Sequence, residues 1–269
     1  MSPAMRTVLW AAVSAIIVLV APVRAADHDA TDIIRKNFMI GKVSDSRADV
    51  TMTLISDNGT RRVRSTTSVS KLLPNGVDQK RLIRFLSPAD VKGTGTLMIE
   101  HSDGDDDIWI YLPALRKVRR LVASNKKDSF VGTDFSYGDI IGHKVDDWTY
   151  QYVGEETLDN VPTFVIECQP RSDEVRTNSG YGKRKLWIRQ DNYVAVKGEF
   201  ADPSGAPFKE FVARDVREID PAHHKWQAFH LEMRNRQTGH ATEIDFSKMD
   251  VGIGASDEQF TERYLEKDS

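Results

Sequence analysis

Residues 107–112 read DIWIYL, and this short stretch decides the fold. Side chains of a β-strand point alternately to opposite faces, so its three aliphatic residues share one face and Trp109 and Tyr111 share the other. Residues 186–188 (LWI) and 193–196 (YVAV) repeat the pattern. A sheet that is apolar on both faces needs a cover on each, or one cover and a ligand. We therefore expect a curved sheet with a concave apolar face, partly closed by helices.

The rest of the chain supports a mainly β fold. Hydrophobic alternation with a period of two runs from about residue 47 to residue 248, and turn residues interrupt it at short intervals. Asp57-Asn58-Gly59 is the clearest hairpin signal. Neither a repeat nor a low-complexity linker divides the chain, so we expect residues 26–269 to form one domain. About eleven sequential strands with short connections predict an antiparallel meander that curls to bury its apolar face.

Helices are expected at the two ends of this domain and within one loop. Thr31 or Asp32 can cap a helix that stops at Gly41, and residues 257–266 suit a short helix. The segment Asn125–Asp147 is rich in Gly, Ser and Asp but also carries aromatic and aliphatic residues. Such a segment is either a functional lid with local helices or a loop tucked over the end of the core.

The first 25 residues differ from the rest of the chain. They carry two charges, Arg6 and Arg24, on either side of the apolar run Val8–Ala21, and small residues follow. A basic start, a short apolar centre and small residues at the end are typical of a cleaved secretory signal peptide. The alternative, a transmembrane anchor, needs about 20 apolar residues. We therefore expect residues 1–25 to be a signal peptide and the mature protein to be exported.

Composition excludes several classes of function. Lys and Arg total 37 against 40 Asp and Glu, a net charge of −3, which is too even for a protein that binds nucleic acid through phosphate contacts. The single cysteine, Cys168, lies far from the expected cleavage site, which argues against a lipid anchor there. It alternates with apolar neighbours and suits a buried position. No cluster of Cys and His suggests a zinc site.

Motifs for catalysis or cofactor binding are weak or missing. The chain has no Gly-x-Ser-x-Gly, no phosphate-binding loop and no His-Glu-x-x-His. Residues 68–71 fit Ser-x-x-Lys, but so short a pattern arises easily by chance. The acidic residues 103–107 do not have EF-hand spacing, and the adjacent His223 and His224 would face opposite sides of a strand. We therefore expect a protein that is not an enzyme, with no cofactor and no metal.

Basic residues concentrate in one part of this acidic chain, between residues 116 and 127. This patch could bind lipid headgroups or an acidic surface of a partner protein. The alternative is a solvated strand face followed by a turn. The candidate docking residues are Arg116, Lys117, Arg119 and Arg120.

One region of the sequence resembles a known family. The segments 107–121 (DIWIYLPALRKVRRL) and 128–139 (DSFVGTDFSYGD) are similar, in this order, to the bacterial outer-membrane lipoprotein-sorting proteins with a LolA-like domain. The resemblance runs from about Asp32 to Leu265. It implies an incomplete antiparallel β-barrel of the LolA/LolB type with a helical lid, located in the periplasm. It also implies a lipid or lipoprotein acyl chain as cargo, and an inner-membrane exporter of the RND type as a partner.

These observations lead to a first hypothesis, a periplasmic protein that binds or carries a lipid or lipidated cargo towards the outer membrane. A second is an accessory protein that docks to an exporter and has a filled core without a ligand. A third, a hydrolase, would need Ser129 or Ser136 beside a histidine. For the carrier, we expect strands 96–101, 107–112 and 183–200 to line the cavity and loop aromatics to lie at its mouth. The expected ligand-binding residues are Leu97, Ile99, Trp109, Tyr111, Phe130, Phe135, Tyr137 and Trp187.

Overall fold

A single antiparallel sheet of thirteen strands makes up most of the protein. A computed structural model describes residues 28–267, so the expected signal peptide lies outside the described residues. The strands are β1 (Asp45–Ile55), β2 (Arg61–Leu72), β3 (Gln79–Ser87), β4 (Gly95–Ile99), β5 (Asp107–Leu112), β6 (Lys117–Leu121), β7 (Trp148–Leu158), β8 (Val161–Pro170), β9 (Lys183–Arg189), β10 (Ala195–Ala201), β11 (Pro207–Asp220), β12 (Lys225–Asn235) and β13 (Ala241–Val251). The helices are α1 (Ala30–Ile40), α2 (Tyr137–Ile141), α3 (Asp173–Ser179) and α4 (Glu262–Leu265), with short 3₁₀ turns between them.

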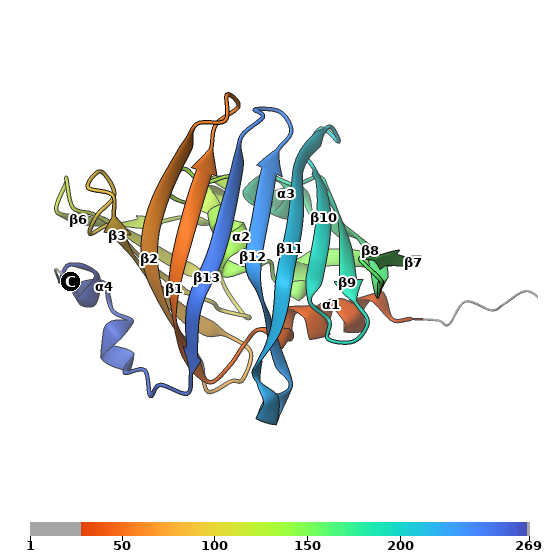
Figure 1. The fold of residues 1–269 in the computed structure, drawn as a ribbon, viewed down its shortest axis with the longest axis horizontal. Helices are drawn as coiled ribbons and strands as arrows, with labels where there is room; N and C mark the ends of the chain where they lie inside the picture. The colour runs from red at the N-terminus through yellow and green to blue at the C-terminus, as the bar shows by residue number, and fades with distance from the viewer. Residues whose placement is uncertain (1–27, 268–269) are drawn as a thin grey trace, which may run out of the picture.

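The sheet is one meander in two halves. Strands β1 to β6 pair consecutively, strands β7 to β13 do the same, and β1 joins the halves by pairing with β13. Because β6 and β7 are the two edges and do not pair, the sheet curls without closing (Figure 1). The expected incomplete antiparallel barrel is confirmed. The strand count exceeds the expected number, and β6 accounts for part of the difference because its charged sequence lacks an apolar alternation.

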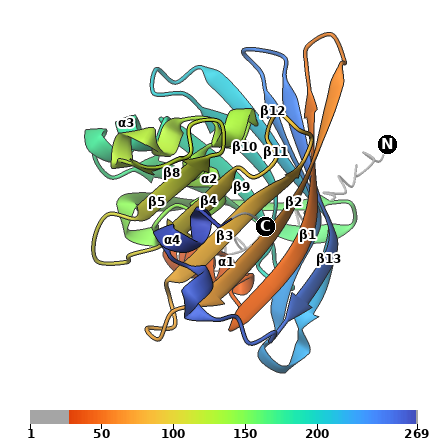
Figure 2. The ribbon, with the colours of Figure 1, turned by 90° about the vertical axis from the view of Figure 1, so that its left-hand side faces the viewer.

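Helices occupy the hollow of the sheet and its rim. Figure 1 shows α1 at one end of the strands and α2 and α3 behind the sheet, whereas Figure 2 shows α4 on the opposite face, over β3 and β4. Helix α1 begins where the Asp29 carboxylate accepts a hydrogen bond from the Thr31 amide at 2.9 Å, and Gly41 caps its end. The segment 125–147 forms short helical turns, including α2, and α3 is a helix that the periodicity does not predict.

The loop before α2 is fixed to the inner face of the sheet. Thr242 on β13 is fully buried; its hydroxyl donates to the Asp134 carboxylate at 2.8 Å and accepts from the Asp134 amide at 2.9 Å. Ser136 then caps α2, accepting from the Asp139 amide. The aromatic segment is therefore an ordered layer of the core.

Two apolar clusters lie on opposite faces of the sheet. The main core fills the concave face, and Ile108 and Ile110 of β5 belong to it together with residues of α1 and of the loop before α2. A smaller cluster covers the convex face, where Tyr111 packs with Phe260 and Leu265 of the C-terminal segment. The two-faced pattern of DIWIYL therefore corresponds to two covers. Within residues 28–267, no helix combines the length and the apolar character needed to cross a membrane.

Candidate functional site

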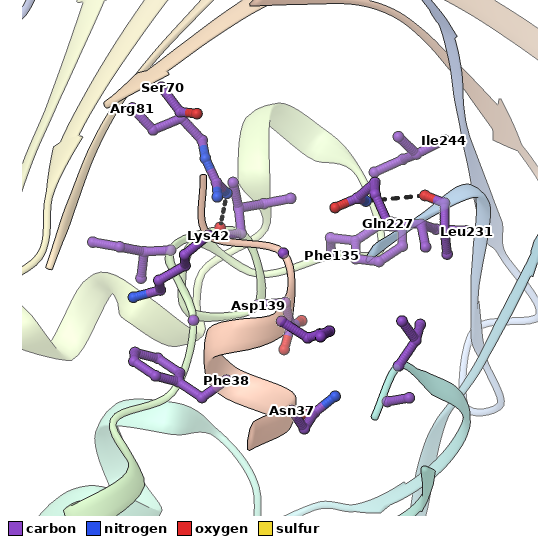
Figure 3. Close-up of a pocket in the computed structure, with 18 of the residues that line it drawn as sticks. Asn37, Phe38, Lys42, Ser70, Arg81, Phe135, Asp139, Gln227, Leu231 and Ile244 are labelled. Carbon is purple, nitrogen blue, oxygen red and sulfur yellow. Dashed lines mark hydrogen bonds between the residues drawn. The ribbon is translucent and has the colours of Figure 1, made fainter. Parts of the chain in front are cut away.

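A cavity of about 450 Å³ remains inside the concave face (Figure 3). It is enclosed by the end of α1, by α2 and by the inner faces of strands from both halves of the sheet. Pockets that bind small molecules typically measure about 300–1,000 Å³. The hollow is therefore large enough for a ligand.

The walls that the strands contribute are mainly apolar. Met52 of β1, Ile83 of β3, Leu231 and Met233 of β12 and Ile244 of β13 all line the cavity. They share one face because alternate residues of each strand point inward. Figure 3 shows Leu231 and Ile244 on one side of the cavity, across from Arg81 and Ser70. An acyl chain would fit such a wall by apolar burial.

The opposite side of the cavity is polar. The Lys42 ammonium donates to the buried Glu100 carboxylate, which also accepts from the Gln79 amide at 3.1 Å. Burial raises the pKa of Glu100, while the charge of Lys42 opposes that shift. Ser46 and Ser70 share a hydrogen bond of 2.8 Å between their hydroxyls. The half-buried Arg81 completes this group, which we call the polar end: Lys42, Ser46, Ser70, Gln79, Arg81 and Glu100.

A second polar cluster holds α2 against the sheet. Asp139 accepts hydrogen bonds from the Tyr181 hydroxyl at 2.8 Å and the Ser136 amide at 2.8 Å, and its carboxylate lies 3.7 Å from the Lys209 ammonium. Burial alone would raise the pKa of Asp139, but the hydrogen bond with His143 and the charge of Lys209 hold it well below its usual range. Asp139 is therefore a buried carboxylate with several partners.

Three of the expected ligand-binding residues come from the loop before α2 and from the first position of α2. Phe135 lines the cavity. Phe130 and Tyr137 pack edge to face in the core, with ring centroids 5.4 Å apart, and do not line it. Phe130 is completely buried because Phe85 of β3 covers it on another side, at 6.0 Å between centroids.

The other five expected residues belong to the opposite face of the sheet. Leu97, Ile99, Trp109 and Tyr111 pack in the convex cluster under the C-terminal segment. Trp187 alternates with Leu186, which lines the cavity, and its indole N–H donates to Glu156 at 2.7 Å. The structure thus brings four of these residues together, but away from the cavity. The physical reason is strand parity, since their immediate neighbours point inward.

Solved structures share this architecture along almost its whole length. A domain described as an outer-membrane lipoprotein-sorting protein domain, from Vibrio parahaemolyticus, is 29% identical, with a TM-score of 0.81 over 88% of this chain and 98% of that chain. A DUF1329 family protein from Desulfovibrio piger is 28% identical, with a TM-score of 0.81 over 88% and 97%. A LolA superfamily protein from Nitrosomonas europaea, at 22% identity, has the same fold with a TM-score of 0.66 over 87% and 98%.

A family model described as "uncharacterized protein"-like matches residues 77–267, well over half of the chain. The chain belongs to the family that this model describes, and it shares the LolA-like fold of the solved structures above. No curated protein matches it. The family resemblance expected from segments 107–121 and 128–139 is therefore confirmed.

The polar end of this LolA-like protein was missed by sequence reasoning. Its charged residues come from the residue after α1's cap, from β3 and from the residue after β4, so no local motif joins them. The sequence does contain one indication of this polar site. Arg81 has the same parity in β3 as the buried Ile83 and Phe85, and Glu100 has the same parity as the buried Met98. Charged residues at inward positions of a strand are costly unless they are partnered, so they indicate a polar site.

The two serines that the hydrolase hypothesis requires, Ser129 and Ser136, have structural roles in this LolA-like domain. The Ser129 hydroxyl donates to the Thr133 carbonyl, and the Ser136 hydroxyl caps α2. The nearby His143 interacts with Asp139, at 3.3 Å from its Nε2. In the described part of the chain, no hydrogen bond joins either serine to a histidine.

His143 predicts a dependence of stability on pH. Burial and the charge of Arg184 lower the pKa of His143 from 6.5 to about 4 in the folded protein. Between these values the unfolded chain binds the proton and the folded one does not, so stability is complete above pH 6.5 and falls towards pH 4. We expect a loss of at most about 3 kcal/mol, at about 1.4 kcal/mol per pKa unit. Urea denaturation at a series of pH values measures it.

The variant His143→Gln is the control for this pH dependence. It cannot titrate, so its unfolding free energy should fall less between pH 6.5 and 4 than that of the wild type. Equal losses in the two proteins would show that His143 is not responsible. The pKa of Asp139 lies below this window in the folded protein, and its ordinary value of 3.8 does so as well, so Asp139 contributes little to the loss between pH 6.5 and 4.

Proposed function

We propose that this protein is a non-enzymatic periplasmic carrier of a lipid or a lipidated cargo. The observation that carries the proposal is the cavity of about 450 Å³, which has an apolar wall of strands and is bordered by α1 and α2. A fully packed core would leave few voids larger than a water molecule. Apolar burial at about 25 cal/mol per Å² would provide affinity for an acyl chain before ordering costs.

The similarity to solved structures also supports a carrier function. The Vibrio parahaemolyticus protein, which matches over 98% of its own length, is described as an outer-membrane lipoprotein-sorting protein domain. We therefore propose that the cargo moves towards the outer membrane. The donor in this proposal is an inner-membrane exporter of the RND type, and residues 1–25 direct the chain to the periplasm.

Lipid uptake by delipidated protein tests the proposal. Gently purified protein should carry an acyl lipid in native mass spectrometry, and the delipidated protein should bind a fluorescent fatty-acyl probe. Ligand binding to the folded state should also raise the thermal midpoint as probe concentration increases. A protein that carries no lipid and takes up no probe would contradict the carrier function.

A second candidate function is docking to an exporter through β6. The specific observation is that Lys117, Arg119 and Arg120 are exposed on this edge strand, next to the exposed Arg116 at the turn before it. Arg120 pairs with Asp107, whereas no ion pair among the described residues involves the other three. Charged side chains also protect edge strands from pairing with other chains, so the patch has a structural explanation as well.

Charge reversal separates docking from edge protection. Replacing Arg116, Lys117 and Arg119 by Glu should weaken binding to the purified exporter at least about tenfold, because like charges replace complementary ones. Probe binding should stay unchanged, since the patch is outside the cavity. The control reverses two exposed residues elsewhere, Arg62→Glu and Lys92→Glu. Exporter binding that survives the triple change would assign β6 to edge protection alone.

A further inference from the structure

The charges around the polar end do not balance. Lys42 and Glu100 form a buried ion pair, which is net neutral whichever of the two holds the proton. Arg81 instead donates to two neutral acceptors, the Ile140 carbonyl and the Gln79 side-chain oxygen, the latter at 2.9 Å. No ion pair of Arg81 is present among the described residues. Among the three charged residues of the polar end, one positive charge is therefore left over. Asp78, whose charge also acts on Lys42, does not line the cavity and is hydrogen-bonded to Asn75 and Ser102.

The guanidinium of Arg81 also faces the cavity. Arg81 lines it and is only half-buried, although it belongs to the inward-facing set of β3. Figure 3 shows Arg81 beside Ser70, with Lys42 on the same side. A guanidinium is always charged and presents a planar fork of donors that matches a carboxylate or a phosphate. Of the two hydroxyls in the Ser46–Ser70 pair, one donates to the other, so one O–H remains to donate to a ligand.

The other charged residues of the lining do not remove this excess. Asp139 is held by Tyr181 and Lys209, so its carboxylate is compensated. Arg184 is buried and lies over the Trp148 ring, 3.9 Å from its centroid, so it adds positive charge and no negative charge. Arg81 is half-buried, whereas Lys42 and Arg184 are buried, so Arg81 is the most accessible of these three cations.

We propose that the cavity selects an amphiphile with an acyl chain and an anionic headgroup, and that Arg81 binds the headgroup. The inference rests on the proposed carrier function and narrows it to a ligand class. The acyl chain lies against the inner strands around Met52, Leu231 and Ile244, and the carboxylate or phosphate lies at the polar end. The negative headgroup neutralises the charge of Arg81, which the neutral Lys42–Glu100 pair does not compensate.

Matched ligands test this selectivity on the delipidated protein. Palmitate, palmitoyl lysophosphatidate and the neutral cetyl alcohol have similar chains and different headgroups. We expect both anions to bind at least about tenfold more tightly than the alcohol, because hydrogen bonds to charged groups are stronger than hydrogen bonds between neutral groups. A preference for palmitate alone would assign the site to free fatty acids, and a preference for lysophosphatidate alone to phospholipids. Equal affinity for the alcohol and both anions would overturn the inference and leave the carrier function standing.

Substitutions in β3 test whether Arg81 causes the preference for anionic headgroups. Arg81→Gln should abolish the preference for anions while the affinity for cetyl alcohol stays the same, and Arg81→Lys should retain part of it. The matched control is Lys80→Gln, which removes a cation from the opposite face of the same strand, where Lys80 pairs with Asp257 at 3.5 Å. This control should keep the full preference. An unchanged preference in folded Arg81→Gln protein would show that Arg81 does not bind the headgroup. An unchanged preference in Arg81→Lys would overturn the two-pronged recognition by the guanidinium. Failure of all three ligands to bind would overturn the carrier function itself, and this inference with it.

Discussion

The variant Ser68→Phe should lose acyl-probe binding by at least about tenfold, equivalent to about 1.4 kcal/mol. Ser68 lies at the middle of β2, where it pairs with Ala48 of β1 and Ile83 of β3, and all three line the cavity. Its side chain is only half-buried although it points inward, so the open space beside it is the cavity. A phenyl ring there would occupy the volume that the acyl chain needs. Titration of the delipidated variant with a fluorescent fatty acid measures the loss.

The matched control is Ser65→Phe, which makes the same change in the same strand. Ser65 is also half-buried, but its parity places it with Val69 on the outer face. Its probe affinity should stay within about twofold of the wild type, and both variants should retain the β-rich circular dichroism spectrum. If Ser68→Phe binds the probe as tightly as Ser65→Phe, the cavity is not the binding site.

The second large effect concerns stability. Phe130→Ala should lower the free energy of unfolding by about 3–5 kcal/mol, the usual cost of removing a buried aromatic ring. Phe130 has no exposed surface and contacts Phe85 and Tyr137, so the cavity left behind is surrounded by packed side chains. Urea denaturation followed by circular dichroism measures the change. The loss arises in the folded core and needs no ligand.

A leucine on the surface provides the comparison for Phe130. Leu115, in the turn before β6, is 58% exposed, and Leu115→Ala should change the unfolding free energy by less than about 0.5 kcal/mol. A similarly small effect of Phe130→Ala would contradict the packing described for the loop before α2. Such a result would instead favour a position of Phe130 at the mouth of the cavity, as the sequence suggests.

Much of the fold was predictable because it depends on local patterns. The alternation of apolar residues predicts most of the strands. Asp57-Asn58-Gly59 predicts the turn between β1 and β2, and Gly41 predicts the end of α1. The predictions failed where a segment lacks such a pattern. Strand β6 has charged residues on most positions and forms because β5 offers it a pairing edge. Helix α3 is too short for a helical period to be visible.

The candidate site was less predictable than the fold. Of the aromatic and aliphatic residues expected to bind a ligand, only Phe135 lines the cavity. Leu97 and Trp109 are as apolar as their neighbours Met98 and Ile108. Alternation shows only that Leu97 and Met98 point to opposite faces of the sheet, and that Trp109 and Ile108 do the same. Which face is concave depends on the direction in which the whole sheet curls. That direction is decided by contacts between segments far apart in the sequence.

The sequence by itself determined that both faces of DIWIYL had to be covered, because apolar side chains alternate along a strand whatever its surroundings. Only the tertiary structure decided what covers each face. The outer face is covered by Phe260 and Leu265 from the end of the chain, and the inner face is buried in the main core, to which α1 and the loop before α2 contribute. Lys42, Arg81 and Glu100 likewise became neighbours only on folding. Burial is a local requirement that a sequence displays, whereas proximity between distant residues follows from the path of the chain in space.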